Sequence, residues 1–128
     1  YRIYLKNMTN TNTTKEYILD AEGQALGRLS SEAAAILNGK KSIDFAKNEV
    51  NDVKVKILNA SKIKLTGNKL KEGIHKTYSG YPGGQKIKTF VQVVERKGYK
   101  EIIKHAIYGM LPKNKLQDKK MKNLSIEE

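Results

Sequence analysis

The sequence has 128 residues and a formal net charge of +12, and this length is typical of one domain with a small core. It contains no cysteine, which excludes a disulfide framework and a thiolate metal site. No apolar run is long enough to span a membrane, and residues 1–14 lack the apolar core of a signal peptide. The sequence begins at Tyr1 and not at a methionine, so further residues can precede it.

The positive charge lies mainly in the second half of the sequence. Residues 1–60 contain 9 basic and 7 acidic residues, whereas residues 61–128 contain 16 basic and 6 acidic residues. An excess of ten positive charges in one half is typical of a protein that binds a polyanion such as a nucleic acid. The alternative is a charge excess that serves only solubility.

The first residues predict an arm followed by a strand. Residues 1–15 are expected to form an N-terminal arm, because residues 7–14 are rich in asparagine and threonine. Residues 16–128 are expected to form a single domain. The short apolar run Tyr17-Ile18-Leu19 predicts a buried strand at its start.

A helix is predicted to start near residues 23–27 and to end at Gly39. Five apolar side chains recur at helical spacing, namely Leu26, Leu29, Ala33, Ile36 and Leu37. Gly39 is well placed to end this helix in a left-handed conformation. The glycines before the helix match no phosphate-loop motif and predict a tight turn, but Arg28 can still contact a phosphate.

Residues 42–65 predict a polar connection and two strands. Ile43 and Phe45 are expected to anchor the connection to the core. Apolar residues alternate with lysines over residues 53–57 and again over residues 62–65, which is typical of half-buried strands. Because only three residues separate the two, we expect them to pair antiparallel in a mixed sheet. Their lysines either line a binding face or keep an edge soluble.

Residues 66–88 are predicted to be a basic RNA-binding loop. Between residues 62 and 88 there are seven lysines and a single acid, Glu72, together with five glycines. Lysines neutralise phosphates, and glycines let the backbone approach a partner closely. Tyr78 and Tyr81 either stack on unpaired bases or pack the loop. The alternative is a solvated surface hairpin.

The last third of the sequence predicts helices and a final strand. Thr89 and Gln92 match a capping box that starts a helix, and Gly98 ends it. Residues 99–111 carry the clearest helical apolar stripe, and His105 beside it is expected to be a surface or packing residue. A short helix around Leu116 and Met121 and a strand through Leu124 and Ile126 are expected to follow.

Short motifs occur in order along most of the sequence. They are Asp20-Ala21, Gly27-Arg28-Leu29, LNGK at residues 37–40, Asn51-Asp52, Asn59-Ala60, TGNK at residues 66–69, Tyr78, YPGG at residues 81–84 and GMLPKN at residues 109–114. This ordered set resembles the universal large-subunit ribosomal protein family number thirteen, in its bacterial or organellar form. The resemblance covers roughly residues 17–124.

The resemblance implies a three-layer α/β/α fold with a small mixed sheet of about four strands. It implies a structural role in translation, in which the protein binds large-subunit rRNA beside neighbouring ribosomal proteins and supports early subunit assembly. The expected location is the ribosome in the cytoplasm or in an organelle. No membrane, small-molecule substrate, cofactor or metal is expected.

The sequence departs from the family pattern at three places. Glu16 stands where the family usually has tryptophan, and Gln117-Asp118 follow Leu116 where Gly-Arg is usual. The family also continues beyond the position of Glu128 with a His-rich segment that ends in Ala-Gln. The rRNA contacts of that segment are therefore not expected from residues 1–128.

The resemblance and the charge pattern together define the expected RNA-binding residues. They are Arg28, Lys40, Lys41, Lys62, Lys64, Thr66, Gly67, Asn68, Lys69, Lys71, His75, Lys76, Tyr78, Tyr81, Gly83, Gly84, Lys86, Lys88, Lys113 and Asn114.

Two other functions are weighed against the ribosomal one. An enzyme needs a base, nucleophile or metal constellation, and the two histidines and scattered carboxylates do not predict one. Asp20, Glu22 and Asp52 can converge only if the strand ends that carry them lie together. A free-standing regulator that binds mRNA or another RNA would use the same basic loop.

Overall fold

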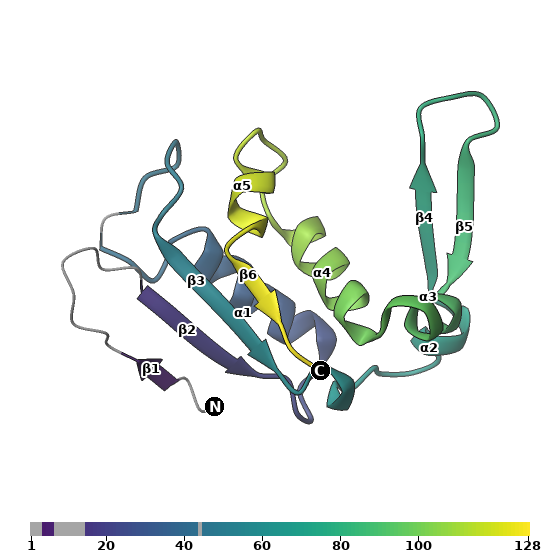
Figure 1. Cartoon of the computed structure of the whole chain (residues 1–128), viewed down its shortest axis with the longest axis horizontal. Coiled ribbons are helices and arrows are strands. Elements are labelled where there is room, and N and C mark those ends of the chain that lie inside the picture. Colours follow the sequence, from purple (N-terminus) through teal and green to yellow (C-terminus); the bar gives the residue numbers. More distant parts are fainter. Residues whose placement is uncertain (1–3, 7–14, 44) are drawn as a thin grey trace.

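The two central strands of the main sheet bury every second side chain along much of their length. The computed structural model describes residues 4–6, 15–43 and 45–128. The sheet has the strand order β1-β2-β3-β6 (Figure 1), with β1 at Tyr4–Lys6, β2 at Lys15–Asp20, β3 at Val53–Leu58 and β6 at Leu124–Ile126. β1 is antiparallel to β2, whereas β2, β3 and β6 are parallel. The predicted α/β class and four-stranded mixed sheet are confirmed.

The buried face of the sheet supports two helices. Leu19, Ile57 and Ile126 occupy one row across β2, β3 and β6, and all three are buried. Helix α1 (Leu26–Leu37) packs over β3, and helix α4 (Tyr99–Met110) packs against α1. Their apolar stripes meet because side chains three and four residues apart share one helix face. Both helices confirm the predictions of a helix between residues 23–27 and Gly39 and of a helix over residues 99–111.

The other face of the sheet remains largely open among the described residues. Lys54 and Ser125 are exposed, and Lys56 is half-buried with its Nζ 2.7 Å from a carboxylate oxygen of Glu127. The expected three-layer arrangement would bury these side chains beneath a helix. The described part of the chain therefore supplies the helical layer on one face of the sheet only.

The turn after α1 depends on Gly39. Its φ of 79° is left-handed, and its N–H donates to the Ile36 carbonyl while the Lys40 N–H donates to the Ala35 carbonyl. These two hydrogen bonds form the glycine-ended motif expected for this helix. A Cβ on Gly39 would overlap the side-chain amide of Asn51, so the LNGK and Asn51-Asp52 motifs meet in space.

Two predictions for residues 42–65 are wrong. Ile43 is 100% exposed and Phe45 is 42% exposed, because Ile36 and Leu37 already fill the core at this end of α1. Residues 62–65 do not form a strand beside β3. Both edges of β3 are occupied by β2 and β6, and the chain instead turns through a 3₁₀ helix, η1 (Ala60–Lys62).

The predicted basic loop is a short helix followed by a β-hairpin. Helix α2 (Lys69–Glu72) leads into β4 (Ile74–Tyr78), which pairs antiparallel with β5 (Gln85–Thr89) and projects from the body (Figure 1). The loop prediction is therefore wrong for residues 69–78 and 85–88. The cause is that most hairpin side chains are exposed, so no buried face imposes the alternation that identifies a strand.

The hairpin joins the body through helix α3 (Phe90–Lys97). The predicted capping box is confirmed, since the Gln92 N–H donates to the Thr89 hydroxyl and the Thr89 N–H donates to the Gln92 side chain. Gly98 ends α3 with a φ of 74°. The predicted short helix is α5 (Gln117–Met121), and the buried Gln117 side chain donates to the Tyr108 carbonyl at 2.7 Å.

Two imidazole rings are in contact, one at the base of the hairpin and one on α4. The ring centroids of His75 and His105 are 4.2 Å apart in an edge-to-face arrangement. The expectation that His105 is a surface or packing residue is thereby confirmed. Partial burial, followed by the neighbouring His75, lowers the pKa of His105 below its ordinary 6.5, although Glu101 opposes the shift. The folded chain therefore favours neutral His105.

Truncating Ile107 should destabilise the body strongly. Its side chain is fully buried between α4 and the rest of the core, so Ile107→Ala should lower the unfolding free energy by about 2–5 kcal/mol. The exposed Ile87 on the hairpin is the matched control, and Ile87→Ala should change stability by no more than about 0.5 kcal/mol. Urea unfolding followed by circular dichroism measures both, and equal losses would contradict the assigned core.

Acidification should weaken the fold through His105. The pKa of His105 is lower in the folded chain than in the unfolded chain, so the unfolded chain binds a proton more readily. The stability that neutral His105 contributes is therefore present above about pH 6.5 and is lost as the pH falls below that value. His105→Gln should flatten this decline. His75→Gln should raise the pKa of His105, which proton NMR can titrate directly. A His105 pKa at or above 6.5 in the wild-type chain would contradict the prediction.

Candidate nucleic-acid interface

Four ion pairs hold part of the described positive charge. They join Lys41 to Glu32, Lys56 to Glu127, Lys62 to Glu22 and Lys97 to Glu101, at 2.7–3.2 Å. The Lys62–Glu22 pair is more than half exposed on both sides, and such surface pairs contribute little to stability. Among the described residues, the other lysines and arginines have no acidic oxygen within 4.0 Å. Lys120 is buried and donates to Asn38, whereas exposed cations such as Lys64 and Lys69 are available to a polyanion.

The start of α1 and the segment before α2 enclose a basic hollow. This hollow has a volume of about 360 Å³, and its polar lining residues are Arg28, Ser31, Lys64, Thr66 and Lys69. Two backbone hydrogen bonds hold the walls together: Leu26 N–H to the Lys64 carbonyl at 3.3 Å, and Lys64 N–H to the Gln24 carbonyl at 2.9 Å. Residues about 40 positions apart in the sequence thus line one site. We call it the α1 hollow.

The electrostatics of the α1 hollow favour an anion. The N-cap position of α1 is Ala25, and no side chain caps the first turn. The uncapped N–H groups and the helix dipole add positive potential to that of Arg28, Lys64 and Lys69. No acidic side chain lines the hollow. Phosphate groups bind well at such helix starts.

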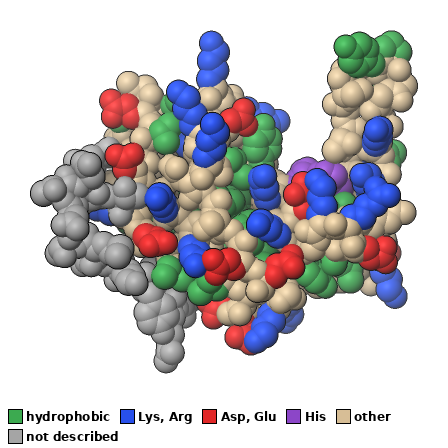
Figure 2. All heavy atoms as spheres, viewed as in Figure 1, with side chains coloured by type: hydrophobic (Ala, Val, Ile, Leu, Met, Phe, Trp, Pro, Cys, Tyr) green, Lys and Arg blue, Asp and Glu red, His purple; other side chains and the backbone are tan. Residues whose placement is uncertain are grey.

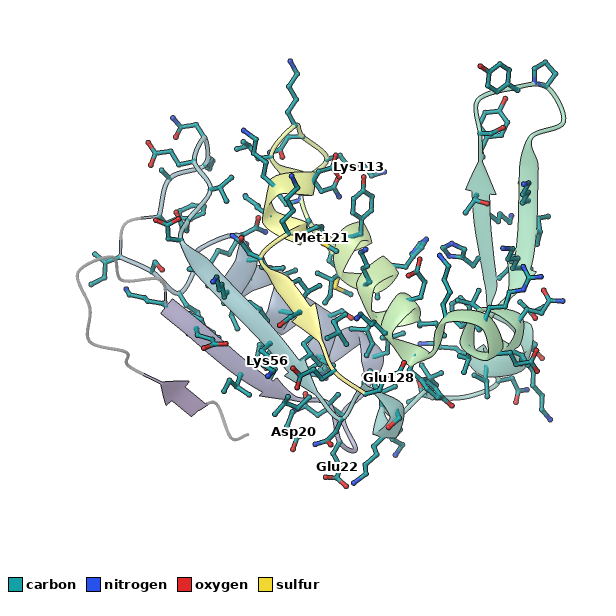
Figure 3. All side chains as sticks on the ribbon, in the orientation of Figure 1. Asp20, Glu22, Lys56, Lys113, Met121 and Glu128 are labelled. Carbon is teal, nitrogen blue, oxygen red and sulfur yellow. The ribbon has the colours of Figure 1, made fainter. Side chains whose placement is uncertain are left out.

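The other predicted residues lie outside this hollow. Lys62 is in η1 and pairs with Glu22, Gly67 and Asn68 form the turn before α2, and Lys71 is in α2. The rest occupy three further places. Lys40 and Lys41 follow the far end of α1, which lies about 14 Å from Arg28 along the helix axis. Lys113 and Asn114 lie between α4 and α5 (Figure 3), and the Asn114 side chain accepts the Leu116 N–H at 3.1 Å. His75, Lys76, Tyr78, Tyr81, Gly83, Gly84, Lys86 and Lys88 belong to the hairpin.

The hairpin presents an aromatic and proline-containing tip. Tyr81 is 75% exposed and lies in the turn between β4 and β5, beside Pro82. Figure 2 shows hydrophobic side chains gathered at the end of this projection, with basic side chains nearer its base. Gly83 has a φ of 73°, and a Cβ on Gly84 would overlap the Ser79 side chain, so the tip needs both glycines.

The acidic residues do not form a catalytic cluster. Asp20 ends β2 and Asp52 precedes β3, so the parallel register places them at opposite ends of the sheet, about 20 Å apart. The convergence that the catalytic alternative would need is therefore absent for Asp20 and Asp52. Asp20 accepts hydrogen bonds from the Asn59 side chain and from the Glu22 N–H, both at 3.0 Å, and these bonds lower the pKa of Asp20, that from Asn59 most (Figure 3).

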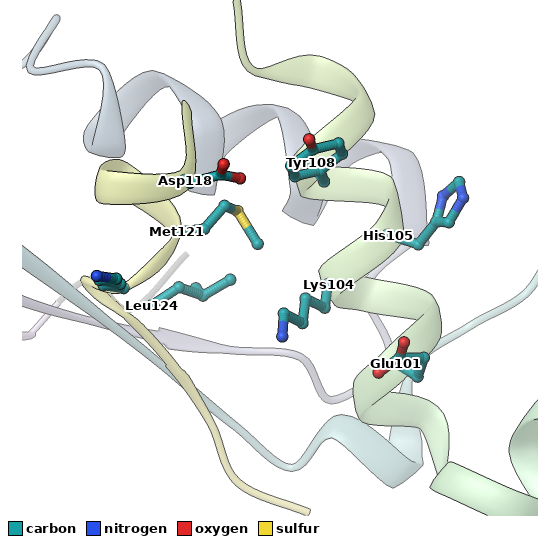
Figure 4. A pocket seen from close by; sticks show the side chains of 8 residues that line it. Glu101, Lys104, His105, Tyr108, Asp118, Met121 and Leu124 are labelled. Carbon is teal, nitrogen blue, oxygen red and sulfur yellow. The ribbon is translucent and has the colours of Figure 1, made fainter. Parts of the chain in front are cut away.

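A hollow beside α5 is not part of the predicted interface. It measures about 500 Å³ between α4, α5 and β6 (Figure 4) and includes Tyr108, Met121 and Leu124 with Lys104 and Asp118. None of the residues that the sequence assigned to RNA binding lines it. In the described part of the chain, no cluster of three or more His, Asp or Glu side chains is arranged to hold a metal ion.

Sequence reasoning did not identify the basic residues of α3. Arg96 and Lys97 lie beside His75 and Lys88 along a small hollow between the hairpin and α3. The only sequence signal for Arg96 was its place near the end of a capped helix, and that signal does not distinguish an interface from an ordinary surface. None of the helices formed by residues 15–43 and 45–128 is long and apolar enough to cross a membrane.

Comparison with known proteins shows the family of the chain. The family model for ribosomal protein L13 matches residues 14–127. Large ribosomal subunit protein uL13 of Symbiobacterium thermophilum is 41% identical over 125 residues, which cover 98% of this chain and 86% of the relative. The proteins of the same name from Mycoplasmopsis synoviae and Brevibacillus brevis are 42% and 49% identical, over 94% and 80% of this chain and 82% and 70% of the relatives.

These relatives are bacterial and give the organellar alternative no support. The matched family consists of structural proteins and not of enzymes, which excludes the catalytic alternative. Because the family model covers nearly the whole sequence, the chain belongs to the ribosomal protein L13 family of the large ribosomal subunit.

Proposed function

We propose that this large-subunit protein binds rRNA through the α1 hollow and the basic segment 66–88, and that this binding supports early subunit assembly. The domain of residues 16–128 acts as a rigid support for both. The observation that carries the proposal is the convergence of Arg28, Lys64 and Lys69 on the uncapped start of α1. This arrangement suits a phosphate group, which occurs at every nucleotide of an RNA strand.

The mechanism is neutralisation of phosphates by fixed cations. Each phosphate contact releases condensed counterions, so the affinity for RNA should fall as salt rises. With about six contacts, the logarithm of the binding constant should fall with the logarithm of salt with a slope of roughly −4 to −5. Arg28 can make a bidentate contact to phosphate, whereas Lys64 and Lys69 act as point charges. Neighbouring ribosomal proteins are the other partners we propose.

Removing the cations of the α1 hollow should weaken rRNA binding. The triple change Arg28→Gln, Lys64→Gln and Lys69→Gln should make the salt slope shallower by about 2–3, because up to three phosphate contacts are lost. Filter binding to large-subunit rRNA over a salt series measures the slope. The matched control removes the same charge from exposed lysines outside the hollow, through Lys15→Gln, Lys47→Gln and Lys54→Gln.

The control should keep the slope of the wild-type chain. Equal losses in the two triple variants would mean that only net charge matters, and a wild-type slope near zero would overturn the phosphate mechanism. Sedimentation tests the assembly role: the wild-type chain should co-migrate with large subunits through moderate salt. A chain that binds RNA steeply but does not co-migrate would instead be a free-standing RNA-binding regulator.

A further inference from the structure

The two faces of the β4–β5 hairpin carry different side chains. Residues directly opposite each other in an antiparallel pair lie on the same face. The pairs His75–Lys88 and Thr77–Lys86 form one face, and both His75 and Lys88 are half-buried toward the body. We call this the inner face. The pairs Ile74–Thr89, Lys76–Ile87 and Tyr78–Gln85 form the outer face.

The inner face forms one wall of a notch. A hollow of about 140 Å³ at its base is lined by His75, Thr77 and Lys88 from the hairpin and by Gln92 and Arg96 from α3. Figure 2 shows the molecule hollowed between the projecting hairpin and the body, with histidine at the bottom. The ring of His105 on α4 meets that of His75, and His105 also lines the larger hollow beside α5 (Figure 4).

Cations without acidic partners line this notch. Among the described residues, Lys86, Lys88 and Arg96 have no acidic oxygen within 4.0 Å, whereas Lys97 is paired with Glu101 at 3.2 Å. Glu101 is the acid that lines the hollow, and this pairing offsets its charge. The net potential of the notch is therefore positive.

The outer face differs in charge and polarity. Lys76 is its single cation, and its large side chains are apolar or aromatic: Ile74, Tyr78 and Ile87 are 53%, 66% and 59% exposed. If the segment bound RNA equally through every lysine, its cations would be expected on both faces of the hairpin. The register of the hairpin instead places most of them on the inner face.

We propose that the notch between the inner face of the hairpin and helix α3 holds a ribose-phosphate strand of RNA, with phosphates against Lys86, Lys88 and Arg96. This inference rests on the proposed rRNA-binding function and adds a second phosphate-binding surface to the α1 hollow. Arg96 supplies a planar fork for two phosphate oxygens. Thr77 and Gln92 supply uncharged hydrogen-bonding groups, which suit ribose hydroxyls.

Salt-dependent binding of large-subunit rRNA by the full chain tests the notch. The double variant Lys88→Gln with Arg96→Gln should make the slope shallower by about 1.4–1.8, since each lost phosphate contact removes about 0.7–0.9. The matched control is Lys54→Gln with Lys100→Gln, which removes equal charge from two exposed lysines outside the hairpin and the α1 hollow. It should leave the slope unchanged.

The outcomes separate this inference from the proposed function. If the α1-hollow triple variant weakens binding but the notch double variant matches its control, the notch inference is wrong and the proposed function stands. A wild-type slope near zero overturns both. Circular dichroism confirms that each variant is folded before its slope is compared.

Site-directed cross-linking provides a second test, because the chain has no native cysteine. Thr77→Cys places a benzophenone label on the inner face, and Gln85→Cys places it on the exposed outer face of the same hairpin. In reconstituted large subunits, the Thr77 position should cross-link to rRNA several-fold more than the Gln85 position. Equal yields, or cross-links from Thr77 to a protein instead of rRNA, would overturn the inference.

Discussion

Helix α1 is packed against the sheet and against α4 at the same time, and the positions of all other elements follow from this double contact. Leu29 and Ala33 are fully buried, as is the small polar Ser30 between them. Protein interiors are close-packed, so a shift of α1 would disturb both neighbours. The same packing fixes the first turn of α1 against Lys64. The geometry of the α1 hollow is therefore set by the core and not by the surface side chains that line it.

The hairpin lies outside that core and depends on its junction with the body. The Phe90 N–H donates to the Gly73 carbonyl at 2.9 Å, and a Cβ on Gly73 would overlap the Phe90 ring and the Lys69 carbonyl. The Thr89 capping box and the His75–His105 contact lie at the same junction. A two-stranded hairpin is marginally stable alone, so these contacts hold it in one orientation. Such preorganisation lowers the entropy lost when a ligand binds.

The sequence allowed the core elements to be predicted but not the hairpin or the convergence of the site. Helices α1 and α4 and strand β3 have one buried face each, and burial imposes a period that can be read directly. The strands IHKTY and QKIKT bury almost nothing, so they show no period. The alternation at residues 62–65 was misleading, because Ile63 is buried next to η1 while β3 already has two neighbours. Arg28 and Lys64 line the same hollow because an isolated parallel bridge joins Ala25 to Lys64. Local sequence patterns cannot reveal such a long-range bridge.

The projecting hairpin has two open strand edges, since β4 and β5 pair only with each other among the described strands. Unpaired backbone groups along an edge can recruit a strand from another copy and begin aggregation. Lysines along the strands oppose this, because two copies that approach edge to edge bring like charges together. Lys76, Lys86 and Lys88 should therefore oppose edge-to-edge pairing of two copies of the hairpin. Neutralising them to improve solubility in a purified sample would have the opposite effect and promote self-association.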